Sequence, residues 1–209
     1  MATFGTLDVI VNCAGYAHQG SIEALTEHEL RRSFDVNVFA PLAVLRHALP
    51  HLRRQRNGHL VNLSSIVGFN GGYAGWGSYA ATKFALAGLT EALADEVREL
   101  GIGATVVYPG PVRTDFLAAG SLVVAAHSIA AYRAAQASLD LHVQQLDGRQ
   151  AGDPVRVAAA IWDAVYAAAP PLHLFLGQIA CQLAQQKIAA VQADLNDWTT
   201  AALATDFAA

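Results

Sequence analysis

The stretch Leu7-Asp-Val-Ile-Val-Asn-Cys-Ala-Gly15 decides the fold. A short, β-branched apolar run that ends in asparagine and glycine is typical of a strand that is buried on both faces of a parallel sheet. Working outward along the chain, further short strands are predicted at 59–64, 104–108 and 173–177. The sequence therefore predicts a parallel sheet of about four strands.

Helical patterns separate these predicted strands. A capping box, Thr26-Glu-His-Glu29, marks the start of one helix, and Pro41 stands where the next helix begins. Three later helices are expected at 79–100, 153–169 and 179–198. Strands that alternate with helices indicate βαβ units with right-handed crossovers. The predicted fold class is α/β, a partial Rossmann-like, doubly wound parallel sheet with flanking helices.

One segment does not follow this alternation. Residues 115–150 are rich in alanine and weakly helical, and they show no clear partner strand. The chain contains no internal repeat and no linker-like tract, so we expect residues 1–209 to form a single domain.

Composition excludes several classes of protein. Of the 209 residues, 54% are hydrophobic and 14% are charged, which is enough apolar content for a real core and argues against disorder. No apolar run reaches the roughly 18 residues of a membrane span, and the N-terminus does not resemble a signal peptide. A net charge of −4 argues against a nucleic acid or an anionic membrane as partner.

The cysteine and histidine spacings predict no metal site. Cys13 and Cys181 lie far apart, and we expect both to be buried in a reducing, cytoplasmic environment. His47 and His51 are one helical turn apart without a third ligand nearby, so a surface or dimer-facing helix explains them better than a metal.

The carboxyl ends of the predicted strands carry the candidate chemistry, because ligands of doubly wound sheets bind there. Tyr79-Ala-Ala-Thr-Lys83 follows the second strand and places a phenol and an ammonium on one helix face. A nearby ammonium favours the phenolate, so we expect Lys83 to lower the pKa of Tyr79 from about 10. Ser65 is placed to hydrogen-bond a reacting alcohol or ketone oxygen. Taken alone, this pair is more typical of an exposed helix face than of a catalytic site.

Five motifs in order make the chain resemble the short-chain dehydrogenase/reductase family. They are Asn12 with Ala14 and Gly15, Asn37 in Phe34-Asp-Val-Asn-Val38, Ser64-Ser65, Tyr79 with Lys83, and Pro109-Gly110 with Val112 and Thr114. The tail, with Trp198 and Thr205-Asp-Phe207, resembles the steroid-dehydrogenase-like branch of the family.

The resemblance implies a role for each matching residue. Tyr79 would be the general acid/base, and Lys83 would lower its pKa and hold the nicotinamide ribose. Ser65 would position the carbonyl or hydroxyl group, and Asn37 would hold a water that relays protons from Lys83. The implied cofactor is NAD or NADP. The residues implied to contact it are Asn12, Ala14, Gly15, Tyr79, Lys83, Pro109, Gly110, Val112 and Thr114.

One family feature is missing from this sequence. It contains no glycine-rich strand-to-helix turn of the kind that holds a dinucleotide diphosphate. The family opens with a βαβαβ part that carries this turn, so we expect the chain to be an N-terminally truncated domain. We also expect weak NAD(P)H binding, and residues 9–11 at an exposed edge of the sheet.

The predicted function is therefore an NAD(P)-dependent oxidoreductase that interconverts a secondary alcohol and a ketone. Apolar residues in 115–150 suggest a substrate lid and an apolar small-molecule substrate, although core packing would explain them equally well. The helices at 39–56 and 79–100 resemble the family's dimer interface, so we expect a homo-oligomer, a dimer or a tetramer. The alternative is a non-catalytic remnant of such an enzyme.

Overall fold

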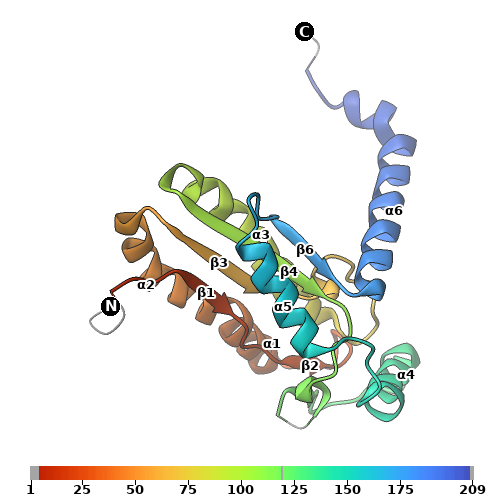
Figure 1. The fold of residues 1–209 in the computed structure, drawn as a ribbon. Helices are drawn as coiled ribbons and strands as arrows, with labels where there is room; N and C mark the ends of the chain where they lie inside the picture. The colour runs from red at the N-terminus through yellow and green to blue at the C-terminus, as the bar shows by residue number, and fades with distance from the viewer. Residues whose placement is uncertain (1–4, 119, 208–209) are drawn as a thin grey trace.

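A computed structural model describes residues 5–118 and 120–207. Its main sheet has four parallel strands in the order β1-β3-β4-β6 (Figure 1). These strands are β1 (Val9–Asn12), β3 (Gly58–Leu63), β4 (Ile102–Pro109) and β6 (His173–Leu176). The four predicted strands and the α/β fold class are therefore confirmed.

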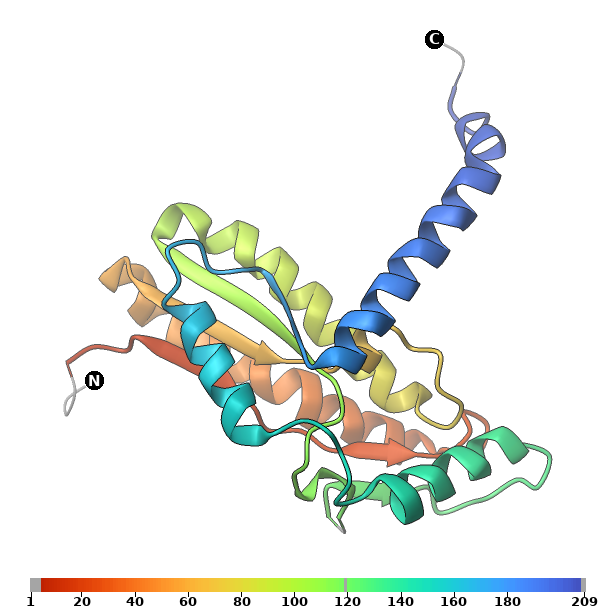
Figure 2. The same cartoon turned by 45° about the vertical axis from the view of Figure 1, so that its right-hand side comes forward.

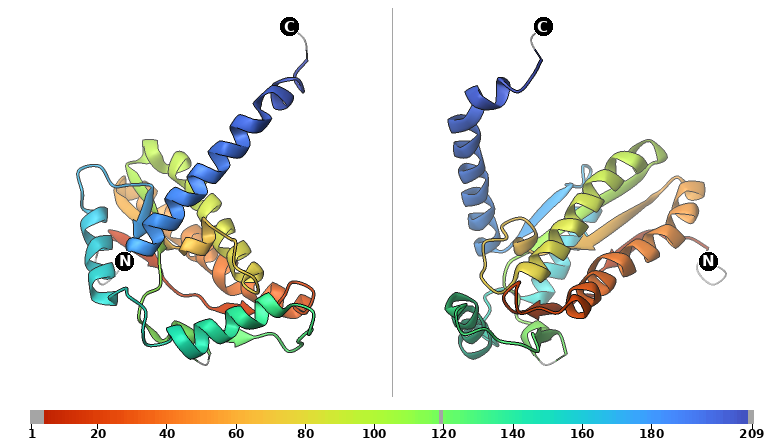
Figure 3. Two further views of the ribbon diagram at one scale, coloured as in Figure 1. Left: turned by 90° about the vertical axis from the view of Figure 1, so that its right-hand side faces the viewer. Right: turned by 180° about the vertical axis from the view of Figure 1, so that it is seen from behind.

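Helices cover both faces of this sheet. The helices α2 (Ala40–Gln55) and α3 (Gly77–Val97) lie on one face, and α5 (Pro154–Val165) lies on the other (Figures 1 and 3). The main apolar core forms between α2, α3 and the strands, with Leu45, Leu52, Leu60, Leu93 and Ile102 buried together. This packing holds the carboxyl ends of the strands in fixed positions.

The predicted capping box begins α1 (Glu27–Phe34). The Thr26 hydroxyl accepts a hydrogen bond from the Glu29 amide at 3.2 Å, and the Glu29 carboxylate accepts one from the Thr26 amide at 2.8 Å. A π-helical turn, Asp35–Phe39, then joins α1 to α2. The sequence did not predict this turn, which carries Asn37.

A second, two-stranded parallel sheet pairs β2 (Ala17–Gln19) with β5 (Leu122–Val124). The expectation that 115–150 has no partner strand is therefore wrong. Each of these strands is only three residues long, too short for a periodic pattern to appear in the sequence. The helix α4 (Arg133–Asp140) lies at the same end of the molecule (Figure 2).

The last helix, α6 (Gln178–Leu203), projects away from the body (Figures 2 and 3). It is longer than the predicted helix and carries Cys181 on its exposed surface. Cys13 is also exposed, because it borders an open cavity, so the expectation of two buried cysteines is wrong. Among the described residues, no helix has the length and apolar character that a membrane span requires.

The strand β1 forms one end of the main sheet in the described part of the chain. The Val11 side chain is 48% exposed, although its β-branched neighbours are typical of a buried strand. The predicted exposed edge at residues 9–11 is therefore confirmed.

Candidate active site

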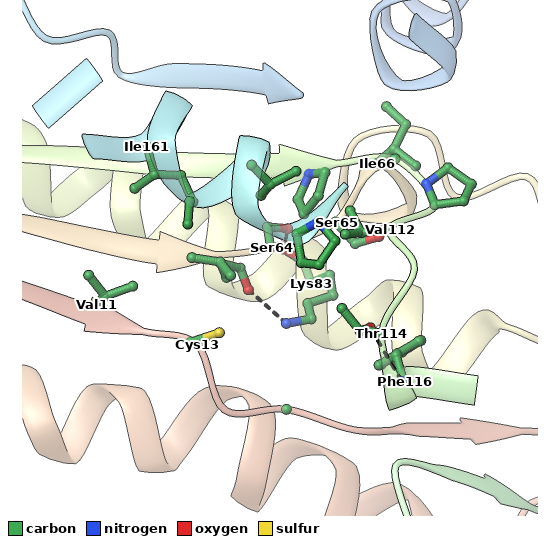
Figure 4. Close-up of a pocket in the computed structure, with 18 of the residues that line it drawn as sticks. Val11, Cys13, Ser64, Ser65, Ile66, Lys83, Val112, Thr114, Phe116 and Ile161 are labelled. Atoms are coloured by element: carbon green, nitrogen blue, oxygen red, sulfur yellow. Dashed lines mark hydrogen bonds between the residues drawn. The ribbon is translucent and has the colours of Figure 1, made fainter. Parts of the chain in front are cut away.

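A cavity of 1090 Å³ opens at the carboxyl ends of β1, β3 and β4 and extends along α5 (Figure 4). Its wall includes most of the site residues predicted from the sequence. These are Gly15, Ser65, Tyr79, Lys83, Pro109, Gly110, Val112 and Thr114. The topology brings them together because parallel strands end at the same edge of a sheet.

Tyr79 and Lys83 lie in the first turns of α3 and face the same end of the cavity. Both are buried, with 6% and 4% of their surface exposed. The Lys83 ammonium lies 5.6 Å from the centre of the Tyr79 ring and donates a hydrogen bond to the Leu63 carbonyl at 2.7 Å. The end of β3 therefore fixes the position of the ammonium beside the phenol.

The two consecutive serines have different roles in the structure. The Ser64 hydroxyl is buried and donates to the Lys83 carbonyl at 2.9 Å, so it joins β3 to α3. Ser65 forms a side-chain hydrogen bond with Tyr79, and its hydroxyl also accepts one from the Val67 amide at 3.3 Å. The geometry thus places Ser65, rather than Ser64, beside the phenol.

The electrostatics of the pair differ from the expectation. Burial raises the pKa of Tyr79 above its usual value, and the Ser65 hydrogen bond lowers it only in part. The same burial lowers the pKa of Lys83 to about 8. The expected net lowering of the Tyr79 pKa is therefore wrong for the structure as it stands, because the loss of solvation outweighs the other influences.

Asn37 lies behind the cavity and is completely buried. Its amide donates to the Tyr16 carbonyl at 2.8 Å and to the Thr82 hydroxyl at 3.0 Å, and its carbonyl accepts from the Tyr16 amide at 3.0 Å. A Cβ placed on Gly15 would lie 3.1 Å from the Asn37 carbonyl oxygen and 3.3 Å from the Lys83 ammonium. Gly15 is thus the narrow point between these two side chains.

Two predicted cofactor contacts do not border the cavity. Asn12 is buried at the end of β1, where its amide donates to the Asn62 side chain at 2.7 Å. Asn62 in turn donates to the Thr90 hydroxyl at 2.9 Å, so this chain of polar groups links β1 to β3 and α3. Ala14 is exposed and is absent from the cavity wall.

Several residues of the cavity wall are not among the predicted site residues. Trp76 donates to the Ser138 hydroxyl at 3.1 Å, and its ring lies 4.7 Å from the His142 ring. The apolar side chains of α5 form a further part of the wall, with Ile161 and Trp162 among them. The aromatic residues before Tyr79 were a usable signal for Trp76, whereas nothing local pointed to His142.

We predict that Lys83 makes stability depend on pH. In the unfolded chain its pKa is 10.5, whereas in the folded chain it is about 8, so the folded state releases its proton first. The unfolding free energy should therefore rise by about 1.4 kcal/mol per pH unit between about pH 8 and pH 10. Denaturant titrations of the wild type and of Lys83→Met across this range measure the effect. Parallel curves for the two proteins would contradict the prediction.

Comparison with known proteins adds to this geometry. A model of the short chain dehydrogenase family matches residues 1–122. Oxidoreductase BOA17 of Botryotinia fuckeliana is 30% identical over 202 residues, which cover 97% of this chain and 73% of BOA17. Human retinol dehydrogenase 8 is 39% identical over 112 residues, or 54% of this chain, but the match spans only 36% of that protein.

Solved structures give the same result. A short-chain dehydrogenase from Streptomyces avermitilis is 38% identical, with a TM-score of 0.88 over 99% of this chain and 73% of that one. Two others share the fold at lower identity: ElxO with NADP bound, at 24% identity and a TM-score of 0.65, and a Burkholderia phymatum protein in complex with NAD, at 21% and 0.77. The chain belongs to the short-chain dehydrogenase family of oxidoreductases.

Proposed function

We propose that this chain carries the catalytic part of an NAD(P)-dependent oxidoreductase that interconverts a secondary alcohol and a ketone. The observation that carries this proposal is the convergence of Ser65, Tyr79 and Lys83 at one end of the 1090 Å³ cavity. Three polar groups in an otherwise largely apolar wall can hold and protonate a single oxygen atom.

The proposed proton path uses the groups in their observed positions. In ketone reduction, the Tyr79 hydroxyl would donate its proton to the substrate oxygen, which Ser65 would hold by a hydrogen bond. The phenol is protonated at neutral pH, as an acid must be, but burial raises its pKa and so makes it a weaker proton donor, an effect that Ser65 offsets only in part. The pKa of Lys83, about 8, suits a group that passes a proton onward, and Asn37 lies just beyond Gly15.

The cavity fits the nicotinamide and its ribose better than it fits the diphosphate of the cofactor. When bound, the cofactor would supply or accept the hydride. In this proposal Lys83 would hold its ribose; Pro109, Gly110, Val112 and Thr114, which line the same cavity, would lie beside the nicotinamide. Elsewhere in the cavity wall, however, the described residues include no second lysine or arginine to face the diphosphate, and the sequence contains no glycine-rich turn. We therefore expect weak NAD(P)H binding by the 209-residue chain.

The wall of the cavity supports an apolar substrate. Its aromatic and aliphatic members include Tyr73, Trp76, Phe116, Leu117 and Leu146. The last three belong to segment 115–150, which supports its proposed role as a substrate lid. The name of the human relative, retinol dehydrogenase 8, describes an enzyme that acts on an alcohol.

A second candidate is a non-catalytic remnant that keeps the fold. It is favoured by the exposed edge of β1 and by the lack of a diphosphate-binding group in the cavity wall of the described chain. In this case the catalytic side chains remain in place, but the chain does not catalyse the reaction.

A direct assay separates the two candidates. The purified chain is incubated with NADH or NADPH and a panel of apolar ketones, while cofactor fluorescence measures binding. Ketone-dependent cofactor oxidation supports the enzyme. Absence of both turnover and saturable binding overturns it for this polypeptide and supports the remnant. Tight cofactor binding at low micromolar concentration would contradict only the expected weak affinity.

We predict that the two serines separate activity from stability. Ser65→Ala should lower kcat/KM by about a hundredfold, because the substrate oxygen loses a positioned donor. Ser64→Ala should instead cost about 1–2 kcal/mol of unfolding free energy, because the buried Lys83 carbonyl loses its donor. Steady-state kinetics and denaturant titrations of both variants check the pair. Equal activity losses would show that Ser65 has no special position.

We also infer that copies of the chain associate through α2 and α3. Phe39, beside the start of α2, and Val44 and Phe84 on the two helices are 56%, 45% and 43% exposed. Exposed apolar side chains on neighbouring helices are typical of an association surface.

A further inference from the structure

The outer part of α6 carries an apolar stripe that nothing else in the described chain covers. The helix is anchored through Ala180 and Ala184, which are 0% and 4% exposed and pack in a cluster with Ile66. Every residue from 185 to 203 is exposed. Figure 2 and the left panel of Figure 3 show this outer part, hereafter the arm, leaving the body.

The apolar residues of the arm follow a coiled-coil pattern. After Ala184 come Ile188, Val191, Leu195 and Trp198, at alternating steps of four and three residues. Their exposed fractions are 57%, 47%, 62% and 70%. Because the stripe continues the face that Ala184 turns to the body, it lines the inner side of the angle between the body and the arm.

We propose that this stripe is an interface with a second copy of the chain, whose arm packs against it in the antiparallel direction. A parallel pairing is disfavoured, because it would put both bodies at the same end of the paired arms, where they would compete for the same space. In the antiparallel arrangement the bodies lie at opposite ends, and each arm tip ends near the partner's body. This proposal does not depend on the catalytic function.

The surface available suits such a pair. The four stripe residues expose on the order of 500 Å² of apolar surface per arm, so two arms bring together about 1,000 Å², near the lower limit for a specific interface. The spacing of the four stripe residues, which centre on position 193, also sets the register. Val191 then lies opposite Leu195 of the partner subunit, and Ile188 lies opposite Trp198 of the partner subunit.

The charge of the arm favours a protein partner over a membrane. Its charged side chains are Lys187, Asp194 and Asp197, so it is weakly acidic. Helices that bind anionic membranes are rich in lysine and arginine on their polar face instead.

Leu195→Asp tests the interface, because Leu195 occupies the two central layers of the proposed pair. The mass of the full chain, measured by sedimentation or light scattering over a micromolar concentration series, should fall by half. The dissociation constant should rise by at least about a hundredfold. Leu203→Asp is the matched control, since Leu203 is 68% exposed on the same helix but lies off the stripe. Circular dichroism checks that both variants fold.

Three outcomes would overturn the proposal. The first is a wild-type chain that stays monomeric throughout the concentration series. The second is an unchanged mass for Leu195→Asp. The third is binding of the wild type to vesicles of anionic or zwitterionic lipid that Leu195→Asp abolishes.

The register has a test of its own. The proposed pairing brings Asp194 close to Asp194 of the partner subunit across the twofold axis, whereas Asp197 points away. Asp194→Asn should therefore tighten the pair about threefold, and Asp197→Asn should leave it unchanged. Equal effects of the two variants would overturn this register.

Discussion

Replacing Tyr79 by phenylalanine should reduce turnover by at least about a thousandfold. The change removes a single oxygen atom, the one that Ser65 contacts and that we propose as the proton donor. The ring keeps its packing against Trp76 and Phe116, whose centres lie 6.1 and 5.4 Å away. The free energy of unfolding should therefore change by no more than about 1 kcal/mol.

Tyr73→Phe is the matched control for this experiment. Tyr73 borders the same cavity, and burial raises its pKa as well, but it has no contact with Ser65 or Lys83 among the described interactions. Removing the Tyr73 hydroxyl should change kcat/KM only a few-fold. Comparable losses in both variants, measured under conditions where the wild type turns over, would remove Tyr79 from its proposed role.

The sheet and its helices could be predicted because their signals are local. Val9, Ile10 and Val11 form a β-branched run, and Thr26 with Glu29 forms a capping box that needs no distant partner. The β2–β5 pair was missed because Ala17 and Leu122 are far apart in sequence and each strand has only three residues. Periodicity cannot detect such short strands.

The candidate site shows the same limit. The motif spacing placed Ser65, Tyr79 and Lys83 at one end of the cavity, because the loop that follows β3 leads into the start of α3. The pKa of Tyr79 was expected to fall, yet burial raises it. The burial of the phenol depends on residues from distant segments that pack over it, such as Phe116. The sequence around Tyr79 does not contain this information.

Gly68→Ala should destabilise the protein by about 3 kcal/mol. Gly68 lies in a short 3-10 turn, Ile66–Gly68, where the chain passes close to α3. A Cβ there would lie 2.3 Å from the Ser64 hydroxyl and 2.8 Å from both the carbonyl carbon and the Cβ of Lys83. Because two of these three atoms belong to the backbone or to the base of a side chain in α3, they cannot move aside without displacing the helix.

The same helix provides the opposite case. A Cβ on Gly88, inside α3, would meet nothing within 4 Å, so Gly88→Ala should stabilise the protein by about 0.5–1 kcal/mol through helix propensity alone. Denaturant titration of both variants measures the contrast. If Gly68→Ala were as stable as the wild type, this would contradict the close packing of the Gly68 backbone against Lys83. Because displacing α3 would also move Lys83 relative to the end of β3, Gly68→Ala should reduce turnover even in the fraction that folds.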